Sequence, residues 1–265
     1  MNFYFQDKAW PELKTYIEQG AIVLVPLGTV EEHGEHMAVG ADAMLAEDTS
    51  REIAQVWNEQ ISNPPMLVLP TFWSGYSMNL MKAWPGTITV RPEIVLGALT
   101  DIIVSLVEMG FYRIVVSNNH GHHDGIIRQL VRDVADRTGC WISVIQPAAF
   151  GAKKFAEIRK TSPGGAIHAG EYETSLLLYY NRPIDMSKAT NVDHMKYSSK
   201  FCPADSFSGS KPVVWSTWGL QKSKTGAYGD PTAATKETGE QIARAIVENA
   251  IEFLKEFCRV TTKPK

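Results

Sequence analysis

Short apolar runs alternate with helical segments along the first half of the chain, and this alternation most constrains the fold. Each run is rich in Val, Ile and Leu and is short enough for a buried strand. The segments between them have apolar residues at helical spacing, or proline at the first helical position. This order predicts an α/β fold, a three-layer α/β/α sandwich with a mostly parallel central sheet. Strands are expected at residues 21–27, 66–70, 113–117 and 141–145, and helices at 46–57, 92–109 and 125–137.

The second half of the chain is less regular. Helices are expected at 150–159 and 171–180, and an amphipathic helix at 236–257 closes the chain. Residues 188–218 are rich in Ser, Pro and aromatic side chains and predict no regular element. No repeat, low-complexity tract or shift in composition divides the chain, so a single domain over residues 1–265 is expected.

The composition is that of an ordinary globular protein, with 44% hydrophobic and 21% charged residues. The net charge is −3 and the basic residues do not cluster, which argues against nucleic acid and anionic lipid and favours a small-molecule substrate. No stretch predicts a membrane helix or a signal peptide, so a cytoplasmic location is expected. The three cysteines lack the spacing of a disulfide framework or a thiolate zinc site.

The first predicted strand ends in a loop dense in metal-ligand side chains. In extended backbone, positions i and i+2 point the same way, so Glu31 and His33 can converge, and Asp42 can return to meet them. Carboxylate and imidazole groups together suit a hard or borderline divalent metal. The alternative is that the acidic residues only solvate the loop while its histidines cap or pack. Further candidates for outer-shell or substrate-side roles are Glu32, Glu35 and His36.

The third predicted strand ends in a second cluster of histidines. His120 and His122 share the i, i+2 geometry, and neutral imidazole is the commonest metal ligand in proteins. In a parallel sheet this loop would lie beside the first one, so the two clusters support each other. His123 and Asp124 are explained equally well by a solvated helix start or by a supporting role.

A third candidate lies at His168, which precedes a helix that carries Glu171 and Glu173. These two carboxylates cannot both face one point on a regular helix, so one is expected to be a ligand or base and the other a surface charge. His194 has no carboxylate nearby in the sequence and is expected to be a surface or core residue. Neither a Gly-x-Ser-x-Gly motif nor a nucleotide-binding glycine motif is present.

These motifs together resemble the creatininase family of creatinine amidohydrolases. The resemblance rests on five ordered segments, including Asn118–Gly121, where Asn119 stands in place of the family's usual glycine. The others are residues 26–42, 84–87 (Trp-Pro-Gly-Thr), 168–175 and 229–235. The resemblance implies an α/β/α single-domain fold and a cytoplasmic homo-oligomer, commonly a hexamer.

The resemblance also implies a two-metal site with Asp42 as the bridging ligand. Glu31 and His120 would complete one metal site, and His33 and Glu173 the other. His122 takes the position of a family glutamate that serves the first metal, and is expected to be a further ligand. His168 takes the place of the family's catalytic histidine. Zinc fits the histidine content best, and manganese or iron would suit the carboxylates.

The implied reaction is the opening of a cyclic amide or related small carbonyl compound by a hydroxide that bridges two metals. Residues 77–87 lack a histidine that many relatives carry, Gly121 stands where creatininase has a substrate-binding tyrosine, and residues 163–167 lack its tryptophan, so creatinine itself is not expected. The alternatives are hydrolysis of a keto-sugar or cyclitol ring or of a lactone, a deformylase, and a catalytically inactive metal-binding relative. Aromatic side chains expected either to line a pocket or to belong to the core or a subunit interface are Trp73, Tyr76, Trp84, Trp215 and Trp218.

Overall fold

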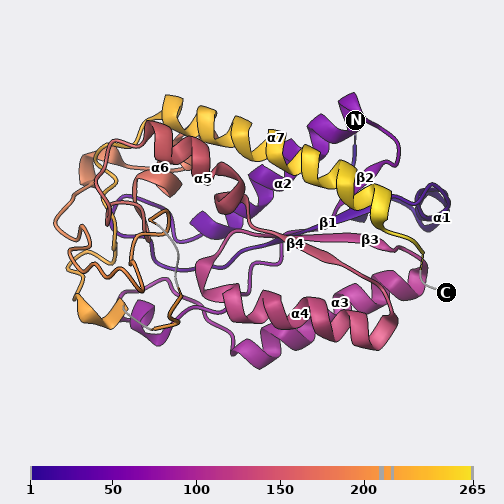
Figure 1. Ribbon diagram of the computed structural model, residues 1–265, viewed down its shortest axis with the longest axis horizontal. Coiled ribbons are helices and arrows are strands. Elements are labelled where there is room, and N and C mark those ends of the chain that lie inside the picture. Colours follow the sequence, from indigo (N-terminus) through magenta and orange to yellow (C-terminus); the bar gives the residue numbers. More distant parts are fainter. Residues whose placement is uncertain (1, 209–211, 216–217, 264–265) are drawn as a thin grey trace.

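A four-stranded parallel sheet lies at the centre of the computed structural model, which describes residues 2–208, 212–215 and 218–263 (Figure 1). The strand order is β2-β1-β3-β4, all neighbours being parallel. Strand β1 pairs with β3 from Ile22 opposite Arg113 to Leu27 opposite Asn118, so both strands end at the same level. The strands are β1 (Ile22–Leu27), β2 (Met66–Val68), β3 (Arg113–Asn118) and β4 (Ser143–Ile145).

Both faces of the sheet are covered by helices, which confirms the predicted three-layer α/β/α fold (Figure 1). Successive residues of β1 point to opposite faces: Ile22 and Leu24 belong to one core, and Val23 and Val25 to the other. The first core lies under α2 (Ala41–Gln60), α5 (Pro147–Ile158), α6 (Glu171–Tyr179) and α7 (Lys236–Val260). The second lies under α3 (Pro92–Met109) and α4 (Asp124–Thr138).

Two helices differ from the sequence-based expectation. Helix α2 begins at Ala41 rather than residue 46, which places Asp42 in its first turn instead of in a loop. The apolar pattern used for the prediction does not reach the first turn, where the buried carboxylate of Asp42 takes an inward-facing position. Helix α1 (Trp10–Glu18) was not predicted, although Leu13, Tyr16 and Ile17 recur at helical spacing and pack, partly buried, against the second core.

The described residues between α6 and α7 lie beyond the carboxyl ends of the strands (Figure 1). They form two 3-10 helices, Met186–Lys188 and Trp218–Leu220, and no α-helix. The prediction of an irregular 188–218 stretch therefore holds where the structure describes it, while 209–211 and 216–217 lie outside the described residues. None of the described helices is long and apolar enough to cross a membrane.

Candidate metal centre

Seven side chains singled out in the sequence meet at the carboxyl edge of the sheet. The loop after β1 contributes Glu31 and His33, and the loop after β3 contributes His120 and His122. The first turns of α2 and α6 contribute Asp42 and Glu173. His168 lies just before α6. All except His122 and Glu173, which are partly buried, are buried from solvent.

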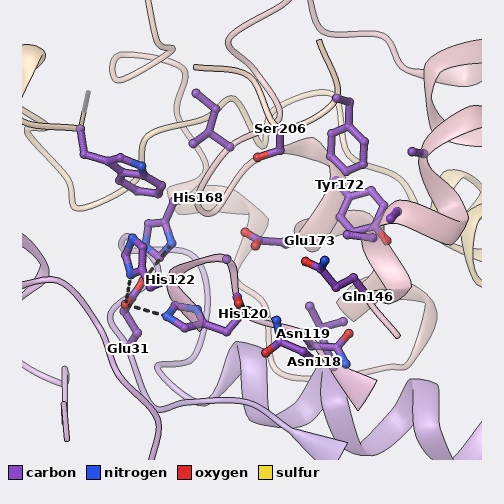
Figure 2. A pocket seen from close by; sticks show the side chains of 18 residues that line it. Glu31, Asn118, Asn119, His120, His122, Gln146, His168, Tyr172, Glu173 and Ser206 are labelled. Atoms are coloured by element: carbon purple, nitrogen blue, oxygen red, sulfur yellow. Dashed lines mark hydrogen bonds and ion pairs between the residues drawn. The ribbon is translucent and has the colours of Figure 1, made fainter. Parts of the chain in front are cut away.

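Asp42 lies between two of the histidines. Its Oδ2 atom is 3.1 Å from His120 Nδ1 and 3.7 Å from His33 Nε2. Glu31 lies in the same way between His122 and His168. Its Oε2 atom is 3.4 Å from His122 Nδ1, and its Oε1 atom is 3.3 Å from His168 Nδ1 (Figure 2). Each carboxylate therefore faces nitrogen atoms from two different segments.

Potential ligand atoms gather in two groups within this cluster. In one, atoms of Glu31, His120 and His122 all lie within 4.8 Å of one another, and in the other the same holds for His33, His168 and Glu173. Asp42 contacts a histidine of each group. The geometry thus provides two adjacent three-residue groups with one carboxylate between them.

Backbone carbonyl groups orient three of the imidazoles. His33 Nδ1 lies 2.9 Å from the Glu31 carbonyl oxygen, His120 Nε2 3.0 Å from that of Tyr76, and His168 Nε2 2.6 Å from that of Glu32. A carbonyl oxygen can only accept, so each of these nitrogens carries a proton and donates it. The opposite nitrogen of each ring is directed at the carboxylates, as is usual for metal-binding histidines.

The cluster has buried polar atoms that no hydrogen bond satisfies among the described residues. These are both carboxylate oxygens of Glu31, Oδ2 of Asp42, and Nε2 of His33 and of His122. No Lys or Arg of the described chain forms an ion pair with these carboxylates or with Glu173. Burying charged groups without partners is costly. Bound divalent cations would supply the missing partners, so the donor set fits a metal centre.

The pKa values of the cluster also reflect its excess of carboxylates over positively charged side chains. Burial opposes ionisation of Glu31, but His120, His122 and His168 hold its pKa well below the usual value. Burial also opposes protonation of His168, yet its hydrogen bond to Glu32 and the charge of Glu31 raise the pKa to about 10. In the same way Asp42 and Glu31 outweigh burial and raise the pKa of His120 to about 9. Without a metal, protonated His120 and His168 therefore offset only part of the carboxylate charge.

Glu171 corrects one expectation. It is fully buried rather than a surface charge, and its carboxylate accepts hydrogen bonds from the backbone N–H groups of Lys160 and Thr161 and from the Thr161 hydroxyl, at 2.6–3.2 Å. Glu173, two residues later, faces the cluster instead and accepts one hydrogen bond from the Ala169 N–H, at 2.7 Å. Burial raises the pKa of Glu173.

The remaining candidates lie outside the ligand groups. Buried His123 uses both ring nitrogens, one with Asn118 Oδ1 (2.9 Å) and one accepting from the Tyr76 N–H (3.0 Å). His36 is buried near Thr174, Glu35 is exposed, and Asp124 pairs with Arg128 on the surface. Glu32 is buried with Oε1 3.6 Å from His168 Nε2, and His194 Nδ1 lies 3.6 Å from Asp230 Oδ2.

A cavity of about 390 Å³ opens beside the cluster, with Glu31, His120, His168 and Glu173 on its wall (Figure 2). Of the aromatic side chains named above, only Trp218 lines this cavity within the described residues. Trp73 and Trp215 are exposed instead. Other polar and aromatic groups around it were not predicted, namely Asn118, Asn119, Gln146, Tyr172, Ser206 and Phe207. The histidines were found because functional residues tend to follow the carboxyl ends of parallel strands, and this strand-end rule could also have found Gln146, which directly follows β4. Ser206 lies in the irregular stretch, where the sequence gives no such signal.

Comparison with known proteins identifies the class of the site. Residues 6–254 match the Creatininase family model, described as creatinine amidohydrolase. The chain therefore belongs to the creatininase family, as its motifs indicated. It is an enzyme, a metal-dependent hydrolase.

Named relatives in this family act on different substrates. Creatinine amidohydrolase of Pseudomonas putida is 26% identical over 96% of this chain and 97% of its own length. A mycofactocin precursor peptide peptidase of Mycobacterium ulcerans is 26% identical, over 86% of this chain and 82% of the relative. A 3-dehydro-scyllo-inosose hydrolase of Thermotoga maritima is 25% identical over 44% of this chain and 36% of the relative.

Solved creatininase structures share the fold. A crystal structure of creatinine amidohydrolase matches with a TM-score of 0.76 and 25% identity, covering 96% of this chain and 98% of that one. Creatininases named as a zinc–zinc form and a manganese form match at TM-scores of 0.77 and 0.75, each at 24% identity. The α/β/α fold predicted from the sequence is thus that of this family.

Proposed function

We propose that the chain is a two-metal hydrolase that opens a small cyclic amide. Glu31, Asp42 and His120 would hold one divalent cation, with His122 beside it. His33, Asp42 and Glu173 would hold the other. The observation that supports this proposal most directly is that Glu31, Asp42 and His33 have buried atoms without hydrogen-bond partners. The neighbouring imidazoles donate hydrogen bonds from their other ring nitrogen to backbone carbonyls.

Zinc is the proposed metal, with manganese or iron as alternatives. The histidines suit zinc, and the names of the zinc–zinc and manganese creatininases support the first two metals. When bound, two divalent cations would lower the pKa of a water molecule and polarise the carbonyl of the substrate.

His168 is the proposed proton donor. Hydrolysis of an amide joins a water oxygen to the carbonyl carbon and breaks the C–N bond, so a proton must reach the leaving nitrogen. The Glu32 carbonyl fixes the proton on Nε2 of His168 and directs Nδ1 toward Glu31. Because His168 also lines the cavity, its Nδ1 atom can deliver a proton to a substrate held there.

Hydrolysis of a keto-cyclitol ring is the second candidate. The cavity wall also carries neutral polar groups, including Asn119, Gln146 and Ser206, which suit ring hydroxyl groups. The Thermotoga maritima relative is named for such a substrate. A lactonase, a deformylase and an inactive metal-binding relative remain the further alternatives.

Substrate assays test the proposal. Protein purified without chelator would be given cyclic amides, keto-cyclitols, lactones and formamides, and assayed again after chelation and after return of zinc or manganese. We expect opening of a cyclic amide that is lost on chelation and restored by metal. Turnover of keto-cyclitols alone would favour the second candidate, and a metal-loaded protein that hydrolyses nothing would overturn both.

We further propose that the protein acts in the cytoplasm as a homo-oligomer, hexameric by resemblance to its family. Light scattering tests the assembly. A mass near six chains of 29.4 kDa is expected, and a mass of one chain would contradict it.

A further inference from the structure

Two neighbouring asparagines at the end of β3 differ in what their side chains do. Asn118 uses both ends of its amide: Nδ2 donates to the His120 carbonyl at 2.9 Å, and Oδ1 accepts from His123 Nδ1 at 2.9 Å. Asn119 is held by its backbone, whose N–H donates to the Leu27 carbonyl at 3.0 Å. Its side-chain Nδ2 is buried and has no partner among the described residues.

Asn119 lies on the wall of the cavity (Figure 2), while its unpaired Nδ2 atom is itself covered from solvent. Leaving a buried N–H donor unpaired is unfavourable, so a partner that arrives with a ligand would be favoured. The loop motif that this segment resembles has glycine at this position, which could not provide such a donor. Asn119 is therefore a feature of this chain rather than of the motif.

The cavity that Asn119 lines combines neutral polar side chains with apolar ones such as Ile167 and Phe207. Gln146, Tyr172 and Ser206 line it, and the described residues of the wall include no Lys or Arg. Its only carboxylates are Glu31 and Glu173, both in the metal-ligand groups. Outside the metal-ligand cluster, a ligand carboxylate or phosphate would find no Lys or Arg on this wall, whereas neutral hydroxyl or carbonyl oxygens would find amide and hydroxyl partners.

We propose that Asn119 is a specificity-determining residue whose side-chain amide turns toward the cavity and donates a hydrogen bond to a neutral oxygen on the part of the substrate beyond the reacting carbonyl. Gln146 and Ser206 extend this polar wall, so the substrate class is an uncharged ring compound that carries hydroxyl or carbonyl groups. This inference rests on the proposed function, because it assumes that the carbonyl to be cleaved lies at the metal-ligand cluster.

The test compares substrates in pairs across variants of the holoenzyme. Each pair is a hydroxylated lactam or keto-cyclitol and its analogue without the distal hydroxyl, with a carboxylate analogue as a third member. In wild-type protein we expect the hydroxylated member to be preferred and the carboxylate analogue to be a poor substrate. Asn119→Gly and Asn119→Ala should lower kcat/KM for the hydroxylated member about tenfold, mainly through KM, and leave the analogue without the hydroxyl nearly unchanged.

Control variants separate this role from general damage. Asn119→Ser retains a donor and should recover part of the preference. Asn191→Gly removes an exposed asparagine away from the cavity and should change neither member. Metal content should remain at the wild-type value in every variant.

The outcomes distinguish the two proposals. Wild-type protein that loads metal and turns over no member of the panel would overturn the proposed function. An active wild type whose preference is the same in Asn119→Gly, or which prefers the carboxylate analogue, would overturn the role of Asn119 alone.

Discussion

At the residue scale, Glu171 and Glu173 show that neighbouring carboxylates on one helix can have unrelated roles. Both belong to the first turn of α6, yet one closes a loop through hydrogen bonds while the other points at the ligand cluster. A helix turns by 100° per residue, so a separation of two places side chains on nearly opposite sides. Helix geometry predicts this divergence but not which residue faces the cluster, whereas the resemblance to the family implied that it is Glu173.

Substitution of Glu171 should therefore lower mainly the stability of the protein, and substitution of Glu173 mainly its activity. Glu171→Ala leaves two backbone N–H groups and the Thr161 hydroxyl without an acceptor, so we expect a loss of about 3 kcal/mol in the free energy of unfolding. Glu173→Gln can still accept from Ala169 and should change stability by less than about 1 kcal/mol. Its activity should fall by more than the roughly 100-fold that loss of an outer partner can cost.

Urea denaturation and steady-state kinetics of both variants check this pair. Comparable loss of stability in Glu173→Gln, or full activity with normal metal content in that variant, would contradict the assignment.

Most of the site residues that the sequence identified lie just after the carboxyl ends of the parallel strands. Glu31, His33, His120 and His122 each follow a buried parallel strand, and such strands end at one edge of a sheet. The strand-end rule places Glu32 and Asn119 at the same edge, but it does not indicate what they contact, because their surroundings include residues from distant parts of the chain.

At the scale of elements, Asp205 holds the segment before His168 in place through an ion pair and hydrogen bonds. Its carboxylate pairs with Arg159 at 2.8 Å and accepts from the Gly164 N–H at 2.7 Å. Burial opposes ionisation, but Arg159 and the N–H groups of Phe207 and Gly164 hold the pKa of Asp205 below its usual value. A carboxylate with a lowered pKa stabilises the folded state above the unfolded pKa, about 3.9, and this contribution is lost as the pH falls through the folded value.

We predict that Asp205→Asn lowers the free energy of unfolding by about 2 kcal/mol at pH 7. The difference from wild type should shrink as the pH falls below about 4. Denaturation series from pH 7 to pH 3 would measure it, with exposed Asp136→Asn as the control. If the difference in free energy of unfolding between wild type and Asp205→Asn stayed constant from pH 7 to pH 3, the ion pair could not be its cause.

Helices α6 and α7 pack in close contact at Gly239. A Cβ atom there would lie 1.9 Å from the Ser175 carbonyl oxygen, so the backbones approach too closely for any side chain. We predict that Gly239→Ala destabilises the protein by about 1–3 kcal/mol and displaces the helix that carries Glu173.

Gly97 in α3 provides the matched control, since a Cβ atom there meets nothing within 4 Å. Gly97→Ala should stabilise the protein by about 0.4–1 kcal/mol by restricting the unfolded chain. Thermal unfolding of both variants checks the pair, and equal effects of the two substitutions would contradict the packing argument.

At the scale of the whole molecule, the fold was more predictable than the boundaries of its parts. Strand–helix alternation determines the parallel sheet and its two covered faces, because each apolar run must be buried on both sides. It does not determine where Asp42 lies, since the start of α2 depends on polar residues that become buried only in the folded protein. The irregular chain between α6 and α7 has no periodicity from which its course over the site could be predicted.

The central claim is that this edge of the sheet binds divalent metal through Asp42. Elemental analysis of protein purified without chelator tests it most directly, with exposed Asp124→Ala as the matched control for Asp42→Ala. We expect about two metal ions per chain in wild type and in Asp124→Ala, and less than about one in Asp42→Ala, all with unchanged circular dichroism. A folded wild-type chain that holds almost no metal, or an Asp42→Ala variant that retains both ions, would contradict the account.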